Sequence, residues 1–197
     1  SDWSSDVCSS DLTQSGSKIS IKWGKVKGAT GYEVYVAYCG KSFSKTPTKR
    51  TTTKTSVSVT KVDGKKINLK KNFKVYVAAI KKKGSKSTQL AKTIAGHIVG
   101  RKNTAYTNAK SITLTTKTIS VAVGKTSTIK AKTVLVNKKK KQLGNGHALE
   151  FRYASSDESI ATVDKNGQVK GVSAGTTTIY VYARNGLAKT VKVTVKK

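Results

Sequence analysis

The side chains best suited to chemistry in this sequence are two histidines and two cysteines. His97 and His147 are the only histidines, and neither lies beside a carboxylate or a candidate nucleophile in the sequence. A catalytic pair needs a base and a nucleophile within hydrogen-bond reach. The sequence offers no such pair. We therefore predict no catalytic residue and no enzyme activity, and we place both histidines on the surface.

The two cysteines, Cys8 and Cys39, are too few for a disulfide framework or for a thiolate metal site. Cys39 has apolar strand neighbours, which favour a small buried hydrophobic side chain over a reactive thiol. We predict no cofactor, and each domain must then be stable through packing alone.

Three carboxylates, Asp157, Glu158 and Asp164, could be imagined as calcium ligands. Their spacing lacks the alternating oxygen donors of a dedicated calcium loop. We assign these side chains to turns and caps, and we predict no metal site.

Lysine dominates the charge of the chain, with 39 Lys and Arg against 9 Asp and Glu and a formal net charge of +30. Such an excess predicts solubility and attraction to polyanions, but it predicts no fold. The first candidate for a polyanion-binding site is the run Lys138, Lys139, Lys140 and Lys141. The competing interpretation is that the lysines only make the surface soluble, and both interpretations stay open.

Nucleic-acid binding would pair a basic face with exposed aromatic side chains or a recognition helix. Most aromatic residues fall instead in strand patterns where core packing explains them, among them Trp23, Tyr32, Phe73 and Phe151. No recognition helix is visible. We predict no specific nucleic-acid partner.

The elements that carry these residues have the pattern of strands. Thr, Val, Ile and Tyr are plentiful, Met is absent, and glycines recur at short intervals. Period-2 alternation recurs in almost every stretch between glycines, whereas no apolar stripe of period 3.6 lasts three turns. No stretch reaches the roughly 18 apolar residues of a membrane span. The sequence therefore predicts an all-β protein without membrane insertion.

The length of 197 residues suits two domains of roughly 90 residues each. The first 12 residues, SDWSSDVCSSDL, differ from the rest and resemble translated sequencing-adapter DNA. They also lack the basic and apolar regions of a signal peptide, so an export signal would lie outside this sequence. The expected division is a non-native, disordered leader over 1–12, a β-sandwich over 13–95, a linker over 96–107 and a second β-sandwich over 108–197.

The first module resembles a fibronectin type III domain. The segment ISIKWGKVKGATGYEVYV is similar to the second and third strands of that family, and NFKVYVAAI is similar to its sixth strand. In that family a tyrosine usually stands at the position of Phe73, and its hydroxyl binds a neighbouring loop. Phe73 cannot make that bond, so this corner is expected to depend on packing alone. No Arg-Gly-Asp tripeptide occurs, so integrin binding has no support.

The second module closely resembles the bacterial immunoglobulin-like group 2 family. Its characteristic segments occur in order as SSD from Ser155, IATVD from Ile160, NG from Asn166, VKG from Val169, AG from Ala174 and a closing VTV from Val193. The glycines at Asn166-Gly167 and Asn185-Gly186 suit tight hairpins. An insert over 137–148, with its lysine run and two glycines, is expected to form a long flexible hairpin loop.

Together the two resemblances imply tandem immunoglobulin-like β-sandwich domains of a secreted bacterial protein, located outside the cell or on its surface. The implied function is non-catalytic adhesion, binding or spacing by a monomer. The expected partners are anionic cell-wall or host-surface polymers, or polysaccharide. The alternative is a pair of accessory modules of a secreted cell-wall or carbohydrate hydrolase whose catalytic domain lies outside this sequence.

Overall fold

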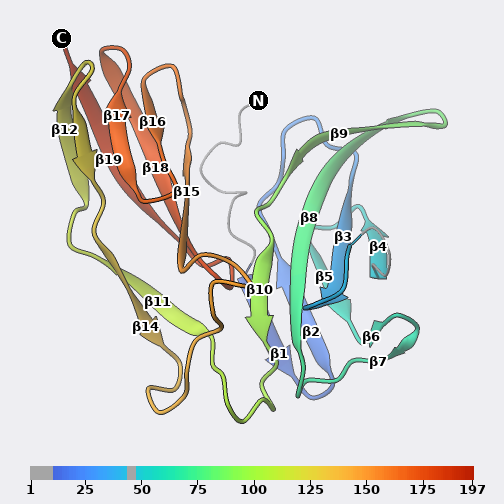
Figure 1. The fold of residues 1–197 in the computed structure, drawn as a ribbon. Helices are drawn as coiled ribbons and strands as arrows, with labels where there is room; N and C mark the ends of the chain where they lie inside the picture. Colours follow the sequence, from blue (N-terminus) through green and yellow to red (C-terminus); the bar gives the residue numbers. More distant parts are fainter. Residues whose placement is uncertain (1–10, 44–47) are drawn as a thin grey trace.

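The computed structural model describes residues 11–43 and 48–197, and these residues form strands, turns and loops without a helix. The prediction of an all-β protein is confirmed. Within the described ranges, no helix is long and apolar enough to span a membrane. Two sandwiches follow one another along the chain, as Figure 1 shows.

The first module consists of two layers and a small hairpin. One sheet has the order β1-β2-β5, and the other has the order β10-β8-β3-β4 with β9 also paired to β8. The strands are β1 (Asp11–Ser15), β2 (Lys18–Lys22), β3 (Gly31–Tyr38), β4 (Thr48–Thr52), β5 (Ser56–Val59), the hairpin strands β6 (Lys61–Val62) and β7 (Lys65–Lys66), β8 (Asn72–Lys83), β9 (Lys86–Lys92) and β10 (Gly96–Val99).

Alternation places one set of side chains between the two layers. In β2, Ile19 and Ile21 are fully buried, and in β8 Phe73 has no exposed surface. Trp23 packs edge-on against Tyr32, with ring centroids 5.4 Å apart. Each fully buried Ile or Val stabilises the fold by about 1.5–3 kcal/mol relative to an exposed one, so this core accounts for the formation of the sandwich.

The loop before β8 is held by a tyrosine hydroxyl from a neighbouring strand. The backbone N–H of Asn68 donates to the hydroxyl of Tyr38 at 2.8 Å, and Tyr38 lies opposite Phe73 in the β3–β8 register. The expectation that this corner depends on packing alone is therefore wrong. The missing hydroxyl of Phe73 is replaced by one from the adjacent strand.

Changing Tyr38 to phenylalanine is expected to lower the free energy of unfolding by about 1 kcal/mol, because Asn68 loses its acceptor while the ring is kept. Urea unfolding measures this difference. Tyr76→Phe is the control, because that ring stacks on Tyr35 across the sheet with centroids 4.5 Å apart. Equal stability of both variants would show that the Tyr38 hydroxyl does not hold the loop.

The edge strand of the first module continues further than the sequence predicts. β9 pairs with residues 78–83 of β8, and β10 pairs with residues 72–75 of the same strand. Thr93–Ala95 interrupt this edge of the sheet between β9 and β10. Thr93 fills the break, since its backbone donates to the carbonyl of Val77 and its hydroxyl accepts from the Val77 N–H. Residues 96–99 therefore belong to the first module, and the linker expected over 96–107 is shorter at its start.

The expected leader also ends earlier than residue 12. Its residues 1–10 lie outside the described residues. Asp11 and Leu12 belong to β1, where Leu12 pairs with Ile21 and packs against the first core. These two residues are thus part of the sandwich.

The second module has a four-stranded sheet of order β12-β19-β18-β15, a three-stranded sheet of order β13-β17-β16 and the pair β11-β14. Its strands are β11 (Ala109–Leu114), β12 (Thr118–Ala122), β13 (Thr126–Thr128), β14 (Ala131–Leu135), β15 (Phe151–Ser155), β16 (Ala161–Val163), β17 (Gln168–Gly171), β18 (Gly175–Ala183) and β19 (Ala188–Lys196). β12 and β19 run parallel, and the other pairs of strands in these sheets are antiparallel.

The core of the second module is closed by side chains from all three sheets. Val169, Ile179 and Val191 are fully buried. The predicted turn at Asn166-Gly167 is present, and Gly167 has a φ of 78°. A side chain at Gly167 would also meet the ring of Tyr153, so this turn requires glycine for two reasons.

The insert over 137–148, expected to be a flexible hairpin loop, is attached to the rest of the protein near its middle. The Thr107 N–H donates to the carbonyl of Lys141 at 2.9 Å, and the Lys141 N–H donates to the carbonyl of Ala105 at 3.2 Å. Leu143 is 3% exposed. The insert therefore packs on residues 100–108, which we call the connector between the modules.

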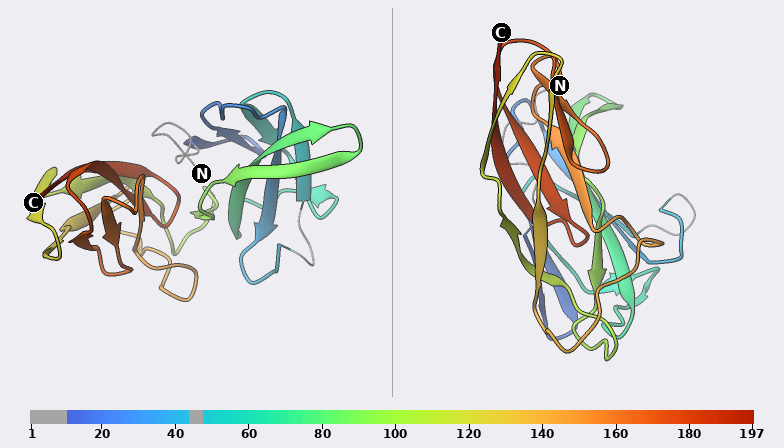
Figure 2. Two further views of the ribbon diagram at one scale, coloured as in Figure 1. Left: turned by 90° about the horizontal axis from the view of Figure 1, so that it is seen from above. Right: turned by 60° about the vertical axis from the view of Figure 1, so that its left-hand side comes forward.

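The two modules lie side by side and converge at one end, where the connector and β10 are located (Figures 1 and 2). At this junction the His97 N–H donates to the carbonyl of Arg184 at 2.7 Å. A Cβ at Gly96 would lie 2.9 Å from the carbonyl oxygen of Asn185. The modules thus touch through their backbones.

Candidate functional site

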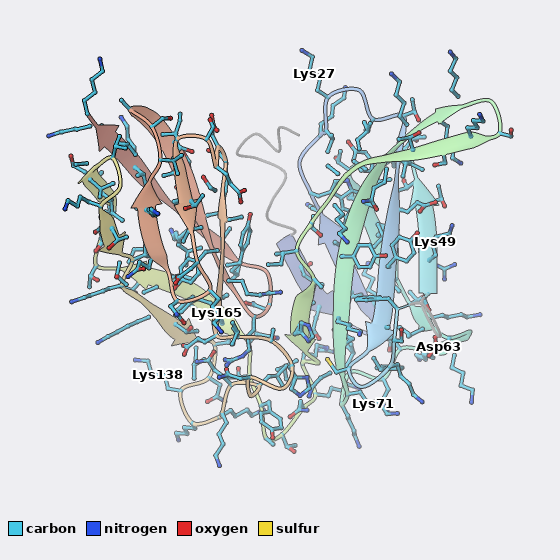
Figure 3. The ribbon with its side chains drawn as sticks, turned by 45° about the horizontal axis from the view of Figure 1, so that its top comes forward. Lys27, Lys49, Asp63, Lys71, Lys138 and Lys165 are labelled. Atoms are coloured by element: carbon cyan, nitrogen blue, oxygen red, sulfur yellow. The ribbon has the colours of Figure 1, made fainter. Side chains whose placement is uncertain are left out.

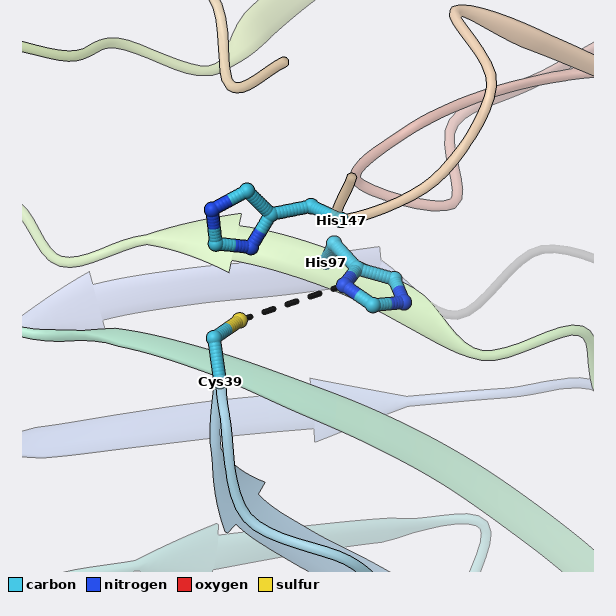
Figure 4. Close-up of side chains that lie close together, drawn as sticks. All are labelled: Cys39, His97 and His147. Atoms are coloured by element: carbon cyan, nitrogen blue, oxygen red, sulfur yellow. Dashed lines mark hydrogen bonds between the residues drawn. The ribbon is translucent and has the colours of Figure 1, made fainter. Parts of the chain in front are cut away.

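Three residues that are far apart in the sequence meet at the junction. Cys39 follows β3, His97 lies in β10, and His147 lies in the insert of the second module. Their potential ligand atoms all lie within 4.8 Å of one another. The Sγ of Cys39 is 3.9 Å from Nδ1 of His97, the contact drawn in Figure 4. We call these three residues the junction cluster.

Sheet register explains why two members share one face of the first module. His97 pairs with Lys74, and Lys74 pairs with Ala37 in the next strand. Cys39 lies two residues beyond Ala37, so its side chain points to the same face. The Cys39 N–H donates to the carbonyl of Asn72 at 2.9 Å, which extends the pairing past the end of β3.

Arg184 positions both histidines. Its carbonyl accepts from the His97 N–H, while its guanidinium holds the segment around His147. Nη2 lies 2.6 Å from Oδ1 of Asn145, and Nε lies 2.8 Å from the carbonyl oxygen of Ala148. The insert is therefore tied to the same residue that orients β10.

The protonation states of the junction cluster argue against a nucleophilic pair. Burial raises the pKa of the Cys39 thiol to about 11, although Lys74 acts in the opposite direction. Burial, together with Arg152 and other nearby cationic side chains, lowers the pKa of His97 to about 4. A reactive cysteine needs a lowered pKa. At neutral pH this pair consists of a thiol and a neutral imidazole, and a protonated thiol is a poor nucleophile.

Arg152 of β15 connects the two modules directly. Its Nη1 lies 2.6 Å from the carbonyl oxygen of Ala95, and its Nη2 donates to the carbonyls of Ala183 and Arg184 at 3.2 and 3.1 Å. Burial lowers the pKa of Arg152 to about 10. The Arg152 side chain therefore links the residue before β10 to the second module, and we call this contact the Arg152 clamp.

The lysine run does not present four equivalent charges. Lys138, Lys139 and Lys141 are exposed, whereas Lys140 is half-buried, and its Nζ donates to the carbonyl of Asn103 at 2.6 Å. The run thus supplies three exposed cations, and its fourth lysine, Lys140, binds the insert to the connector.

An open hollow of about 360 Å³ lies beside this run, between the connector, β1 and the insert. Its lining includes Arg101, Asn103, Asn137 and Lys140, together with the exposed ring of Tyr106. We call it the connector hollow. It combines cations, amides and an aromatic face, which are groups that bind a hydrated, anionic chain molecule.

The remaining positive charge spreads over both modules. Figure 3 shows Lys27 and Lys71 at opposite ends of the first module and Lys138 and Lys165 on the second. Over residues 11–43 and 48–197, a single ion pair is found, between Lys49 Nζ and Glu33 Oε1 at 3.2 Å. The cationic surface is therefore almost uncompensated by carboxylates.

Two of the three acidic residues considered as calcium ligands, Asp157 and Asp164, form turns. Oδ1 of Asp157 accepts from the N–H and the hydroxyl of Ser159. Oδ1 of Asp164 accepts from the N–H groups of Asn166 and Gln168 at 2.9 and 2.8 Å. Both carboxylates thus serve the local backbone.

Sequence reasoning missed the junction cluster. It treated Cys39 as a small buried hydrophobic residue and both histidines as separate surface residues, whereas the structure gathers all three, each half-buried. No local motif marks them, because 58 residues separate Cys39 from His97 and each ligand comes from a different segment. Only the pairing of β10 with β8 and the folded insert bring them together.

Several solved structures are similar to this chain at low identity. The chain is 18% identical to domains 4 and 5 of the S-layer protein SbsC, with a TM-score of 0.39, covering 94% of this chain and 85% of that one. Against a longer SbsC structure the identity is 17% and the TM-score 0.38, covering 90% of this chain but 22% of that one. Because these scores are below 0.5, we draw no functional conclusion from them.

A C-terminal fragment of intimin, in complex with the intimin-binding domain of the translocated intimin receptor, is 16% identical with a TM-score of 0.30, covering 98% of this chain and 65% of that one. No curated protein matches the sequence. Residues 108–195, by contrast, match the bacterial Ig-like domain (group 2) family, which identifies the second module as an immunoglobulin-like domain.

Proposed function

We propose that this chain is a non-catalytic module pair of a bacterial cell-surface protein that attaches to anionic cell-wall or host-surface polymers. The uncompensated cationic surface carries the proposal. The group 2 match of residues 108–195 supports a module of this class. The states of Cys39 and His97, a thiol and a neutral imidazole at neutral pH, give no support to a nucleophilic site.

The first module is, in this proposal, a fibronectin type III-like domain. Its strands form two sheets, β1-β2-β5 and β4-β3-β8-β10, and this two-layered arrangement supports the proposal. The segments similar to the second, third and sixth strands of that family occupy β2, β3 and β8.

The connector hollow and the lysine run beside it form the proposed polymer-binding surface. Lys138, Lys139 and Lys141 supply exposed charge, and Tyr106, 38% exposed, offers a ring on which a sugar can stack. Attraction between exposed charges is screened beyond about 10 Å at 0.1 M salt. Binding is therefore expected to be strong at low salt and to weaken as salt is added.

The test is binding of the full chain to purified wall teichoic acid over a salt series. Changing Lys138, Lys139 and Lys141 to glutamine is expected to weaken binding at low salt about tenfold, since each exposed pair contributes up to about 1 kcal/mol. Lys140 is kept, because its bond to Asn103 fastens the insert.

The matched control changes Lys81, Lys82 and Lys83 to glutamine, which removes the same charge from the β8–β9 hairpin. Tyr106→Ala separates sugar stacking from charge, because it leaves the net charge unchanged. Equal weakening by the two triple variants would place attachment on the whole surface instead of the connector hollow. Absence of binding at low salt would exclude polymer attachment and leave the lysines as a solubilising surface.

A further inference from the structure

We propose that Cys39, His97 and His147 form a binding site for a thiophilic transition-metal ion, with zinc as the reference ion, and that this ion joins the two modules. The three potential donor atoms lie within 4.8 Å of one another and come from both modules. The site does not depend on polymer binding.

The donor set selects the class of metal. One sulfur and two imidazole nitrogens suit zinc, cobalt, nickel or copper, whereas calcium and magnesium prefer oxygen ligands. No carboxylate belongs to the junction cluster. Three protein ligands would leave one position of a tetrahedral ion open to water.

The distances are close to those of a bound site. Tetrahedral zinc with bonds of about 2.0–2.3 Å places its ligand atoms about 3.4–3.6 Å apart. Cys39 Sγ and His97 Nδ1 are 3.9 Å apart, and the widest separation in the junction cluster is within 4.8 Å.

The ligands are held in place by contacts that need no metal. Arg184 binds the His97 N–H through its carbonyl and the segment around His147 through its guanidinium. Cys39 is fixed by its backbone bond to Asn72. Such supporting contacts orient metal ligands in proteins and raise their affinity.

The local charge is the main opposing factor. The positive charges of Arg152, Arg184 and Lys74 act on His97 and disfavour added positive charge there. Loss of the thiol proton on binding supplies one negative charge at the ion. Because His97 and Cys39 come from the first module and His147 from the second, the bound ion stabilises the junction in its folded arrangement.

The experiment titrates cobalt and then zinc into the full chain carrying Cys8→Ser, which removes the second cysteine. Cobalt is expected to bind with a stoichiometry of one and to give a thiolate-to-cobalt charge-transfer band, which zinc abolishes. Cys39→Ser is expected to remove the band and to weaken zinc binding about 100-fold or more, and His147→Gln to weaken it about 10–100-fold.

Thermal unfolding without metal shows whether each variant is folded, and only variants that unfold like the Cys8→Ser chain are compared. Small-angle scattering is expected to report a narrower range of module orientations with zinc than without it. A cobalt complex without the charge-transfer band, or equal zinc affinity in the Cys39→Ser variant, would overturn the proposal. Because polymer binding is measured on separate variants, its failure would leave this result unchanged.

Discussion

Replacing Arg152 with alanine is expected to lower the free energy of unfolding by about 2–3 kcal/mol and to loosen the junction between the modules. The guanidinium donates to three backbone carbonyls, one of which, that of Ala95, belongs to the first module. Hydrogen bonds from a charged donor contribute about 1.5–3 kcal/mol. The carbonyl of Ala95 loses this donor, whereas those of Ala183 and Arg184 keep bonds from the N–H groups of Gly186 and His97. Calorimetry measures the stability, and small-angle scattering measures the spread of module orientations.

Arg50→Ala is the matched control, because Arg50 is an exposed arginine on β4 and its loss changes the net charge by the same amount. A surface substitution of this kind is expected to change stability by less than about 0.5 kcal/mol. If the two variants have the same stability and the same scattering, Arg152 is not a clamp between the modules.

Replacing Gly100 with alanine is expected to destabilise the first module by about 3 kcal/mol. A Cβ at this position would collide with the carbonyl oxygens of Leu69 and Lys71, and neither atom is the end of a flexible side chain. The collision would also break the bond from the Gly100 N–H to the carbonyl of Lys71. The connector would then lose one of its bonds to the loop before β8, while those of Lys102 to Leu69 and Asn103 to Lys70 would be strained.

Gly144→Ala is the control for this change. Gly144 lies in the insert, and a Cβ there would meet no atom within 4 Å. With Trp3 changed to phenylalanine in both chains, thermal unfolding followed by tryptophan fluorescence reports Trp23 in the first core. If the Gly100→Ala and Gly144→Ala chains have the same melting temperature, the connector can shift on the first module without loss of stability.

The junction gives the module pair a defined geometry. Backbone contacts at His97 and Gly96, the Arg152 clamp and the insert packed on the connector all act at the same end of the two sandwiches. A polymer bound at the connector hollow would therefore contact both modules. A metal ion at the junction cluster would stabilise the same arrangement, because its ligands come from both modules.

The strands were predictable because each is specified locally. Alternation in Ile19 and Ile21, and again in Val191 and Val193, predicts which face enters a core, and the structure buries all four. Turns are specified locally as well. The Asp-Gly pair at Asp63-Gly64 is typical of a tight turn, and both residues have positive φ in the structure. An all-β fold therefore follows from periodicity and turn residues alone.

The ends of elements were less predictable. The break at Thr93–Ala95 resembles the end of a strand in the sequence, yet β10 resumes on the same edge because β8 is long enough to pair with both halves. The insert resembles a flexible loop because it is rich in lysine and glycine. Its order comes from the connector and from Arg184, which are distant in the sequence.

The sequence by itself determined the fold class, the group 2 character of the second module and the cationic surface, because these depend on local pattern, motif and composition. Only the tertiary structure decided that Cys39, His97 and His147 meet, that Tyr38 replaces the missing hydroxyl of Phe73, and that Lys140 is a fastening and not a free charge. Each of these depends on register between strands or on contact between modules. Such long-range pairings leave no periodic signal in the chain.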